Sequence, residues 1–209
     1  MDGLLIDSEP FWQEAEIEAF RKVNLQLTPE NCRETTGFCI NEVVDYWYRL
    51  RGWSGMSQQE MVEEIVSRVI QLIKEKGKLK PGVEKAIAFV KNLGVKTALA
   101  SSSNYRIIKT TLEKFNLTSQ FDVIHSAEEE DFGKPHPAVY LSTSRKLAVP
   151  PDACLAIEDS LPGVIAAKAA RMKCIAVPER EDKRFIIADI QLSSLEELNM
   201  DIWKQINSA

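Results

Sequence analysis

From residue 80 onward, short apolar runs alternate with segments in which apolar positions recur at helical spacing. The stretch "PGVEKAIAFVKNLG" (81–94) predicts a helix that Gly94 closes, and "VKTALAS" (95–101) predicts a β-branched, apolar strand. The same unit then repeats, with helices predicted over 104–116, 137–147 and 162–172 and strands predicted over 121–126, 153–159 and 173–178. Because these strands are almost continuously apolar, helices should cover both faces of a parallel sheet. The pattern predicts a doubly wound, Rossmann-like α/β core.

Residues 9–80 differ, because they carry helical patterns and no convincing strand. Ser8 with Pro10 marks one helix start, and Thr28 with the following proline marks another. Ser57 and Glu60 form an S-x-x-E capping box at the start of a helix that ends at Gly77. We therefore expect a core domain made of 1–8 and 81–209, with 9–80 inserted as a helical cap over the carboxyl ends of the strands. Ligands bind at that edge of open α/β sheets.

Composition narrows the possible partners and location. The 209 residues include 31 acidic and 26 basic side chains, the net charge is −5, and the basic residues are scattered, so a nucleic-acid partner is not expected. No apolar run approaches the ~20 residues that span a bilayer, and the first residues show neither the charged region nor the small-residue cleavage site of a signal peptide, so none is expected. We expect a cytoplasmic monomer without a membrane partner. The four cysteines form no C-x-x-C pair, which argues against zinc.

Polar side chains follow four of the apolar segments, at the predicted carboxyl edge of the sheet. They are Asp2 in "MDG", Ser101 in "ALASSSN", Lys134 in "GKPHP", and Glu158 with Asp159 in "AIEDS". Phosphoryl transfer needs acidic ligands for a divalent cation, a lysine and a hydroxyl for the phosphate, and a proton donor for the leaving oxygen. Each of these roles has a candidate in this set.

Structural alternatives exist for each of these residues. Asp2 alone could be a turn residue, and any serine of 101–103 could cap the helix that begins near Asn104. Ser8 is expected to cap the next helix. For Lys134, a functional role is favoured over that of a solvated surface lysine, because the flanking glycine and proline fix the backbone around it. The adjacent acids at 158 and 159 repel one another unless a cation or a basic group lies between them.

The aromatic residues of the cap are a possible sugar-stacking platform. We expect most of them to form the core of the cap, since a small lobe must bury large side chains, while one or two face the site. This set comprises Trp12, Tyr46, Trp47, Tyr48 and Trp53.

The order D-G-x-L-x-D-S, then serine at a strand end, then G-K-P, then E-D-S, resembles the haloacid dehalogenase superfamily over nearly the whole chain. The stretches "LLIDSEPFW", "VVDYWY" and "KPHPAVYL" are most similar to the bacterial 2-deoxyglucose-6-phosphate and hexitol-phosphate phosphatases. The resemblance implies a magnesium-dependent phosphatase that acts on a small sugar or sugar-alcohol phosphate through an aspartyl-phosphate intermediate.

The resemblance also implies a role for each matching residue. Asp2 would be the general acid and base, and its backbone carbonyl would help hold Mg²⁺. Asp159 would ligate the metal, with Glu158 supporting it directly or through water. The catalytic and phosphate-binding set would then comprise Asp2, Ser101 and Lys134, with Gly3, Ser102 and Asn104.

One part of the family motif precedes the sequence. The motif reads D-x-D-G, and its first aspartate, the nucleophile, corresponds to the position just before Met1. We expect the intact protein to carry that aspartate and the strand that delivers it. Two alternatives remain: a phosphosugar mutase of the β-phosphoglucomutase type, or a non-catalytic phosphate-binding relative if the chain truly starts at Met1. The first cap helix lacks the histidine or early arginine expected of those mutases.

Overall fold

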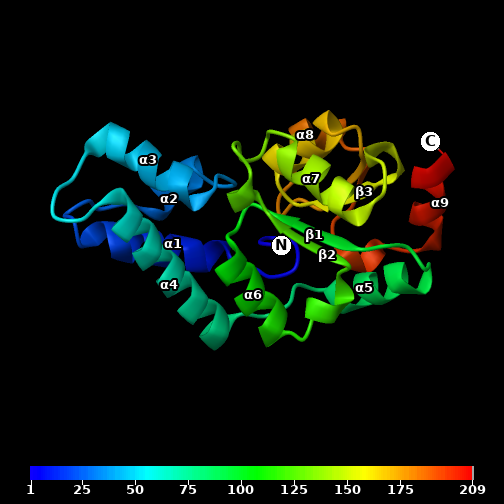
Figure 1. Ribbon diagram of the computed structural model, residues 1–209, viewed down its shortest axis with the longest axis horizontal. Coiled ribbons are helices and arrows are strands. Elements are labelled where there is room, and N and C mark those ends of the chain that lie inside the picture. The colour runs from blue at the N-terminus through cyan, green and yellow to red at the C-terminus, as the bar shows by residue number, and fades with distance from the viewer. Residues whose placement is uncertain (209) are drawn as a thin grey trace.

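The computed structural model describes residues 1–208 and has an α/β core beside a group of helices (Figure 1). Strands β1 and β2 pair in parallel, with Ala98 opposite Val123, and strands β3, β4 and β5 form a second parallel sheet. The strands are β1 (Ala98–Ser101), β2 (Val123–Ser126), β3 (Leu155–Glu158), β4 (Lys173–Ala176) and β5 (Ile190–Gln191).

The predicted α/β class is confirmed, but the strands form two sheets. In the part of the chain that the structure describes, no ladder joins the β1–β2 pair to the three-stranded sheet. The carboxyl ends of β1 and β3 nevertheless reach the same cavity, since Ser101 and Glu158 both line it. The carboxyl ends of the strands therefore meet at one edge, as the sequence predicts, although the two sheets are not continuous.

Helices lie on both sides of the strands, as the doubly wound pattern requires (Figure 1). Helix α7 contacts β1 and β2, and α8 contacts β3 and β4, while α6 packs on β2 and α5 on the Leu195–Glu197 turn. These helices are α5 (Val83–Asn92), α6 (Tyr105–Lys114), α7 (Ala138–Leu147) and α8 (Leu161–Ala169). Strand β5, helix α9 (Met200–Ser208) and five 3₁₀ turns were not predicted; the turns are Thr118–Gln120, Ala127–Glu129, Pro151–Ala153, Lys183–Ile187 and Leu195–Glu197.

The helices predicted before residue 80 form the group at the left of Figure 1. Their expected caps are present at two starts: the Thr28 hydroxyl accepts the Asn31 N–H at 3.3 Å, and the Ser57 hydroxyl accepts the Glu60 N–H at 3.2 Å. The helices are α1 (Glu9–Arg21), α2 (Pro29–Glu34), α3 (Ile40–Arg51) and α4 (Gln58–Lys76). We call residues 9–80 the cap; its status as a separate domain stays a prediction.

One hydrophobic cluster runs through both the cap and the core. Helix α4 packs against α1 and α3 within the cap and against α6 of the core. Trp47 is fully buried in this cluster, and Trp12, Tyr46 and Trp53 pack against it half-buried, as expected for most of the cap aromatics, although Tyr48 is 41% exposed. Each fully buried large apolar side chain contributes about 1.5–3 kcal/mol, so the contact of α4 with α6 holds the cap in place over the site. No described helix has the length and apolar character needed to cross a membrane.

Candidate active site

A cavity of about 150 Å³ lies between the cap and the carboxyl ends of β1 and β3. Every site residue that the sequence predicts lines it, although these residues come from four separate stretches of the chain. They are Asp2, Gly3, Ser101, Ser102, Asn104, Lys134, Glu158 and Asp159. The spatial convergence on which the functional interpretation depends is therefore present.

The carboxylate of Asp2 is fixed by three donors. Its Oδ1 accepts the Ser8 hydroxyl at 2.6 Å and the Trp12 indole N–H at 3.4 Å, and its Oδ2 accepts the Ser103 hydroxyl at 2.6 Å. The expected capping role of Ser8 is wrong, because its side chain makes no bond to helix α1 although it occupies the N-cap position. Donors from two loops and a cap helix thus orient one acid toward the cavity, as a proton-transferring group requires.

The polar residues of the loop after β1, residues 101–104, have different roles. Ser101 is 3% exposed, and its Oγ accepts the backbone N–H of Ser103 at 3.1 Å. Ser102 lines the cavity and is half-buried. Asn104 caps helix α6, because its side-chain oxygen accepts the Ile107 N–H at 3.1 Å. That oxygen is engaged by the helix, so a phosphate contact from Asn104 would use its amide N–H groups.

Lys134 and Glu158 form a buried ion pair. The Lys134 Nζ donates to Glu158 Oε1 at 2.5 Å, and the side chains are 8% and 6% exposed. The Tyr140 hydroxyl donates to the same carboxylate, and the ammonium lies 5.0 Å from the centroid of the Tyr140 ring. Burial on its own would raise the pKa of Glu158, but the Lys134 charge and these hydrogen bonds hold that pKa below its ordinary value.

The start of helix α8 also packs on Glu158. Ser160 caps the helix by accepting the Gly163 N–H at 3.1 Å, and its hydroxyl lies 3.3 Å from Glu158 Oε2. A Cβ on Gly163 would lie 2.1 Å from the Glu158 carboxyl carbon, so only glycine allows this approach. The helix therefore closes the buried side of the carboxylate.

Asp159 is half-buried beside Glu158 and forms no ion pair within residues 1–208. Burial and the adjacent Glu158 charge raise the pKa of Asp159 to about 7. Gly3 has a φ of +66°, and a Cβ there would lie 2.0 Å from Asp159 Oδ2. The glycine of "MDG" thus makes room for this carboxylate against the backbone.

The expected metal ligands, Asp2, Glu158 and Asp159, stay a prediction. The described side chains include no group of three or more Asp, Glu, His or Cys placed to hold an ion. Lys134 and Tyr140 bind Glu158, while Ser8, Trp12 and Ser103 bind the Asp2 carboxylate. These bonds are compatible with the expected roles, in which Asp2 contributes its backbone carbonyl and Glu158 acts directly or through water. Of the three acids, Asp159 is the one whose carboxylate binds no other side chain in the described residues. A single carboxylate with carbonyl, water and phosphate oxygens still fits Mg²⁺, which usually binds through one or two carboxylates and substrate phosphate.

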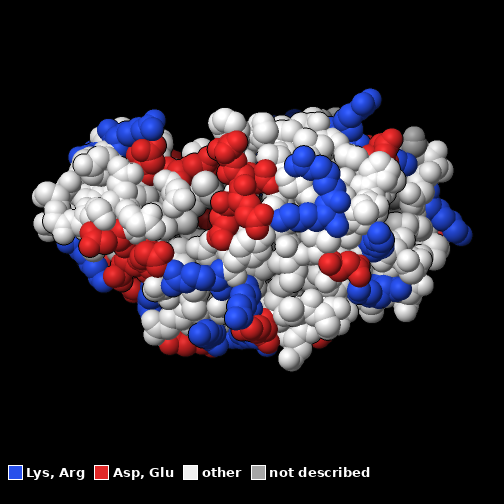
Figure 2. Space-filling model, in the orientation of Figure 1, with Lys and Arg blue, Asp and Glu red and all other residues white. Residues whose placement is uncertain are grey.

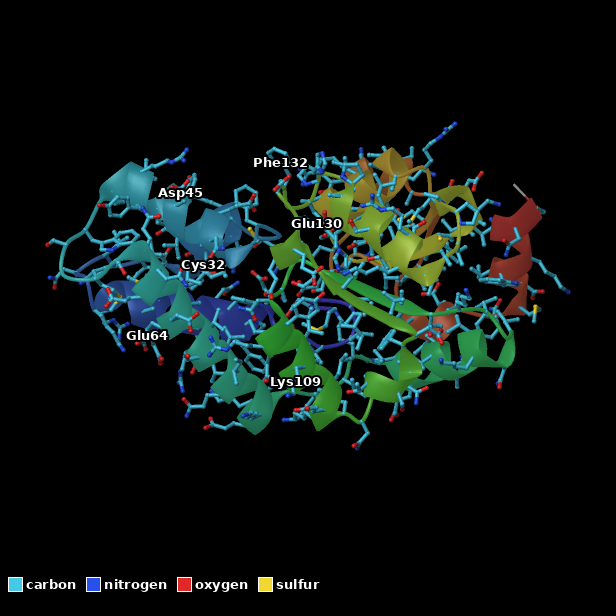
Figure 3. All side chains as sticks on the ribbon, in the orientation of Figure 1. Cys32, Asp45, Glu64, Lys109, Glu130 and Phe132 are labelled. Carbon is cyan, nitrogen blue, oxygen red and sulfur yellow. The ribbon has the colours of Figure 1, made fainter. Side chains whose placement is uncertain are left out.

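The cap contributes side chains that sequence reasoning missed or left open. Trp12 faces the site, and Glu16, Cys32, Phe38 and Val43 line the cavity with it. Figure 3 labels Cys32 in the cap, on the side toward the core. Helical spacing could have indicated that Trp12 and Glu16 share a face of α1, since they lie four residues apart. No sequence signal showed that this face points at Asp2.

Comparison with known proteins assigns the family. The model of the haloacid dehalogenase-like hydrolases matches residues 1–177, so the chain belongs to this family. Among curated proteins, hexitol phosphatase B of Escherichia coli K12 is 46% identical over 202 residues, covering 95% of this chain and 91% of that protein. The phosphorylated carbohydrates phosphatase of Thermotoga maritima is 32% identical over 183 residues, covering 84% and 81%.

Solved structures agree with this assignment. CbbY from Rhodobacter sphaeroides, crystallised with phosphate, superposes with a TM-score of 0.86 at 29% identity, covering 95% of this chain and 93% of that chain. The agreement extends over both the cap and the core, so the resemblance inferred from the four motifs is confirmed for the whole fold.

Proposed function

We propose that the chain is a magnesium-dependent phosphatase that hydrolyses a small sugar or sugar-alcohol phosphate through an aspartyl-phosphate intermediate. The general class, a phosphoric monoester hydrolase, follows from the family and from its phosphatase relatives. The finer substrate class is supported by the hexitol and carbohydrate phosphatases among those relatives. The observation that carries the proposal is the convergence of Asp2, Ser101, Lys134 and Asp159 on one cavity.

The phosphate end of the cavity is built from Ser101 and Lys134. The Lys134 ammonium has three donors and gives one to Glu158, so further donors stay free for phosphate oxygens. The Ser101 hydroxyl and the backbone N–H groups of its loop add neutral donors. Glu158 and Tyr140 hold the ammonium in place, which limits the reorganisation needed when charge develops on the phosphoryl oxygens.

Asp2 is placed to transfer the proton of the leaving oxygen. Its three side-chain donors hold the carboxylate while leaving it in contact with the cavity. In this role it protonates the sugar oxygen as the phosphate ester breaks and later deprotonates the water that hydrolyses the phosphorylated aspartate. That aspartate corresponds to the position before Met1 in the family motif. Mg²⁺, held by Asp159 and the Asp2 carbonyl, would supply neutralising charge to the phosphate oxygens.

The test is phosphate release by a version of the chain extended by an apolar strand that ends in aspartate directly before Met1. This protein should hydrolyse a hexitol phosphate and a generic aryl phosphate with Mg²⁺ and lose the activity with EDTA. Asp2→Asn should lower kcat/KM for the hexitol phosphate by roughly 10²- to 10⁴-fold, the usual contribution of a general acid and base.

The matched control carries the same extension with asparagine in place of the terminal aspartate, and it should be inactive. Retention of full activity by Asp2→Asn would contradict the role given to Asp2. Equal activity with and without Mg²⁺ would contradict the metal-dependent mechanism.

A further inference from the structure

Glu16 is a buried acid in the cap that the proposed chemistry does not use. It lies on helix α1, lines the cavity and is only 6% exposed. Its Oε2 is inaccessible to solvent and has no hydrogen-bond partner in the described chain. A buried polar atom left unpaired costs about 1–3 kcal/mol, so an acid at this position needs an explanation.

The surroundings of Glu16 provide no cation to neutralise it. Burial, with a smaller contribution from the Glu9 charge, raises the pKa of Glu16 to about 7, and the neighbouring Cys32 thiol offsets part of this shift. Glu9 is itself engaged, because its Oε1 accepts hydrogen bonds from Gln13 and Thr36. Glu9 cannot donate to the unused oxygen of Glu16, because an ionised carboxylate only accepts hydrogen bonds, and the Gln13 and Thr36 donors beside it are engaged by Glu9.

The other polar groups of the cap that line the cavity already form hydrogen bonds within the protein. The Trp12 indole donates to Asp2, and the Thr36 hydroxyl donates to Glu9. Cys39 begins helix α3, and its backbone N–H donates to Glu42. Among the described cap side chains that line the cavity, Glu16 thus combines full burial with a free hydrogen-bond acceptor. It lies opposite the core, which carries the phosphate-binding groups.

We propose that Glu16 is a specificity-determining residue whose carboxylate accepts a hydrogen bond from a hydroxyl of the alcohol portion of the substrate. This inference rests on the proposed function and names what the cap recognises: a phosphate monoester of a polyhydroxylated alcohol. When the phosphate binds between Ser101 and Lys134, the carbon chain extends toward the cap, where Glu16 lies. Sites built to bind a hydroxyl reject analogues that lack it, because the buried polar group is then left unpaired.

The melting temperature of a Glu16 variant separates ligand recognition from a structural role. A structural glutamate would lower the melting temperature when replaced by an apolar side chain. A glutamate kept for a ligand costs the free protein stability, so Glu16→Leu should melt at or above the temperature of the wild type.

The experiment is calorimetric titration of the 209-residue chain with Mg²⁺ and three probes: a hexitol 6-phosphate, hexyl phosphate, which has the same length without hydroxyls, and inorganic phosphate. Glu16→Leu should weaken hexitol phosphate binding by roughly 10- to 100-fold, the loss of one hydrogen bond to a charged group. Binding of hexyl phosphate and inorganic phosphate should change less than about twofold. Glu16→Gln keeps an acceptor oxygen and should lose less than Glu16→Leu.

Glu18→Gln is the matched control, because Glu18 lies on the same helix, is exposed and binds Arg68, which Glu14 also binds. It should bind all three probes as the wild type does. Unchanged hexitol phosphate affinity in Glu16→Leu, or an equal loss for all three probes, would overturn the role of Glu16 alone. Failure of the wild type to bind any phosphate probe would overturn the proposed function and this inference with it.

Discussion

The buried pair of Lys134 and Glu158 gives a prediction whose size and pH dependence both follow from the structure. Lys134→Met removes the ammonium but keeps a side chain of similar length, so the Glu158 carboxylate stays buried with only the Tyr140 and Ser160 hydroxyls as partners. Removing one partner of a buried ion pair costs about 3–5 kcal/mol. Because two hydroxyl donors remain, we expect the lower end, about 3 kcal/mol at neutral pH.

The assay is urea unfolding followed by circular dichroism, supported by thermal melting. For a chain of this size, each kcal/mol shifts the melting temperature by about 2–4 °C, so the variant should melt roughly 6–12 °C lower. The double variant Lys134→Met with Glu158→Gln should recover most of the loss, since no uncompensated charge then remains in the site.

The pH dependence has a definite sign. In the wild type, the pKa of Glu158 lies below its ordinary value of 4.5, so the stabilisation is present above pH 4.5 and is lost as the pH falls through the folded-state pKa. Without Lys134, burial raises that pKa above 4.5, so the cost in the variant is present at neutral pH and disappears as the pH approaches 4.5. The stability difference should therefore shrink on acidification. An equal difference at pH 7.5 and pH 4.5, or no difference at pH 7.5, would refute this reasoning.

Two further predictions concern single positions. Gly3→Ala places a Cβ 2.0 Å from Asp159 Oδ2 at a φ of +66°, so it should weaken Mg²⁺ binding at least tenfold by calorimetry, and wild-type affinity would show that Asp159 is not the ligand. Ser57→Ala removes the N-cap of α4 and should lower the free energy of unfolding in urea by about 1 kcal/mol, with phosphate affinity unchanged. A loss of phosphate affinity in this variant would show that the start of α4 contributes to the site.

The helical and strand elements were predictable because local signals agreed with the tertiary structure. Thr28 and Ser57 begin helices through side-chain bonds within their own segments, so the sequence alone contains the information. The apolar runs that became β1 and β3 were equally clear. The two-residue strand β5 lacked such a signal. Helix α9 has one that was missed, because the Asn199 side chain accepts the Asp201 and Ile202 N–H groups at its start. The division into two sheets is a property of strand pairing, which apolar patterns do not specify.

The site was predictable as a set of residues but not as a network. Motif order identified Asp2, Lys134 and Asp159, and the structure places them around one cavity. The partners that orient them were missed: Ser8 and Ser103 were interpreted as helix caps, whereas the Ser8 hydroxyl binds Asp2 from the adjoining turn and the Ser103 hydroxyl binds it from the loop after β1. Hydrogen bonds between distant segments leave no periodicity in a sequence, so only coordinates reveal them.

The acidic side chains are distributed unevenly over the surface, which the net charge does not reveal. Figure 2 shows acidic side chains gathered near the middle of the displayed face, while the total charge is only −5. Residues 128–131 are four consecutive acids after β2, and Glu130 and Phe132 are labelled in this region in Figure 3. This surface would repel free anions, so the affinity for phosphate has to come from the buried donors of the cavity.

The most direct test of the central claim is a crystal structure of the chain with Mg²⁺ and orthovanadate, which mimics a transferring phosphoryl group. Our account predicts vanadate oxygens within about 2.7–3.2 Å of Ser101 Oγ and Lys134 Nζ. It also predicts Mg²⁺ at roughly 2.1 Å from an Asp159 carboxylate oxygen. Vanadate bound outside the cavity, or Mg²⁺ bound without Asp159, would contradict the claim that these residues form one phosphoryl-transfer site.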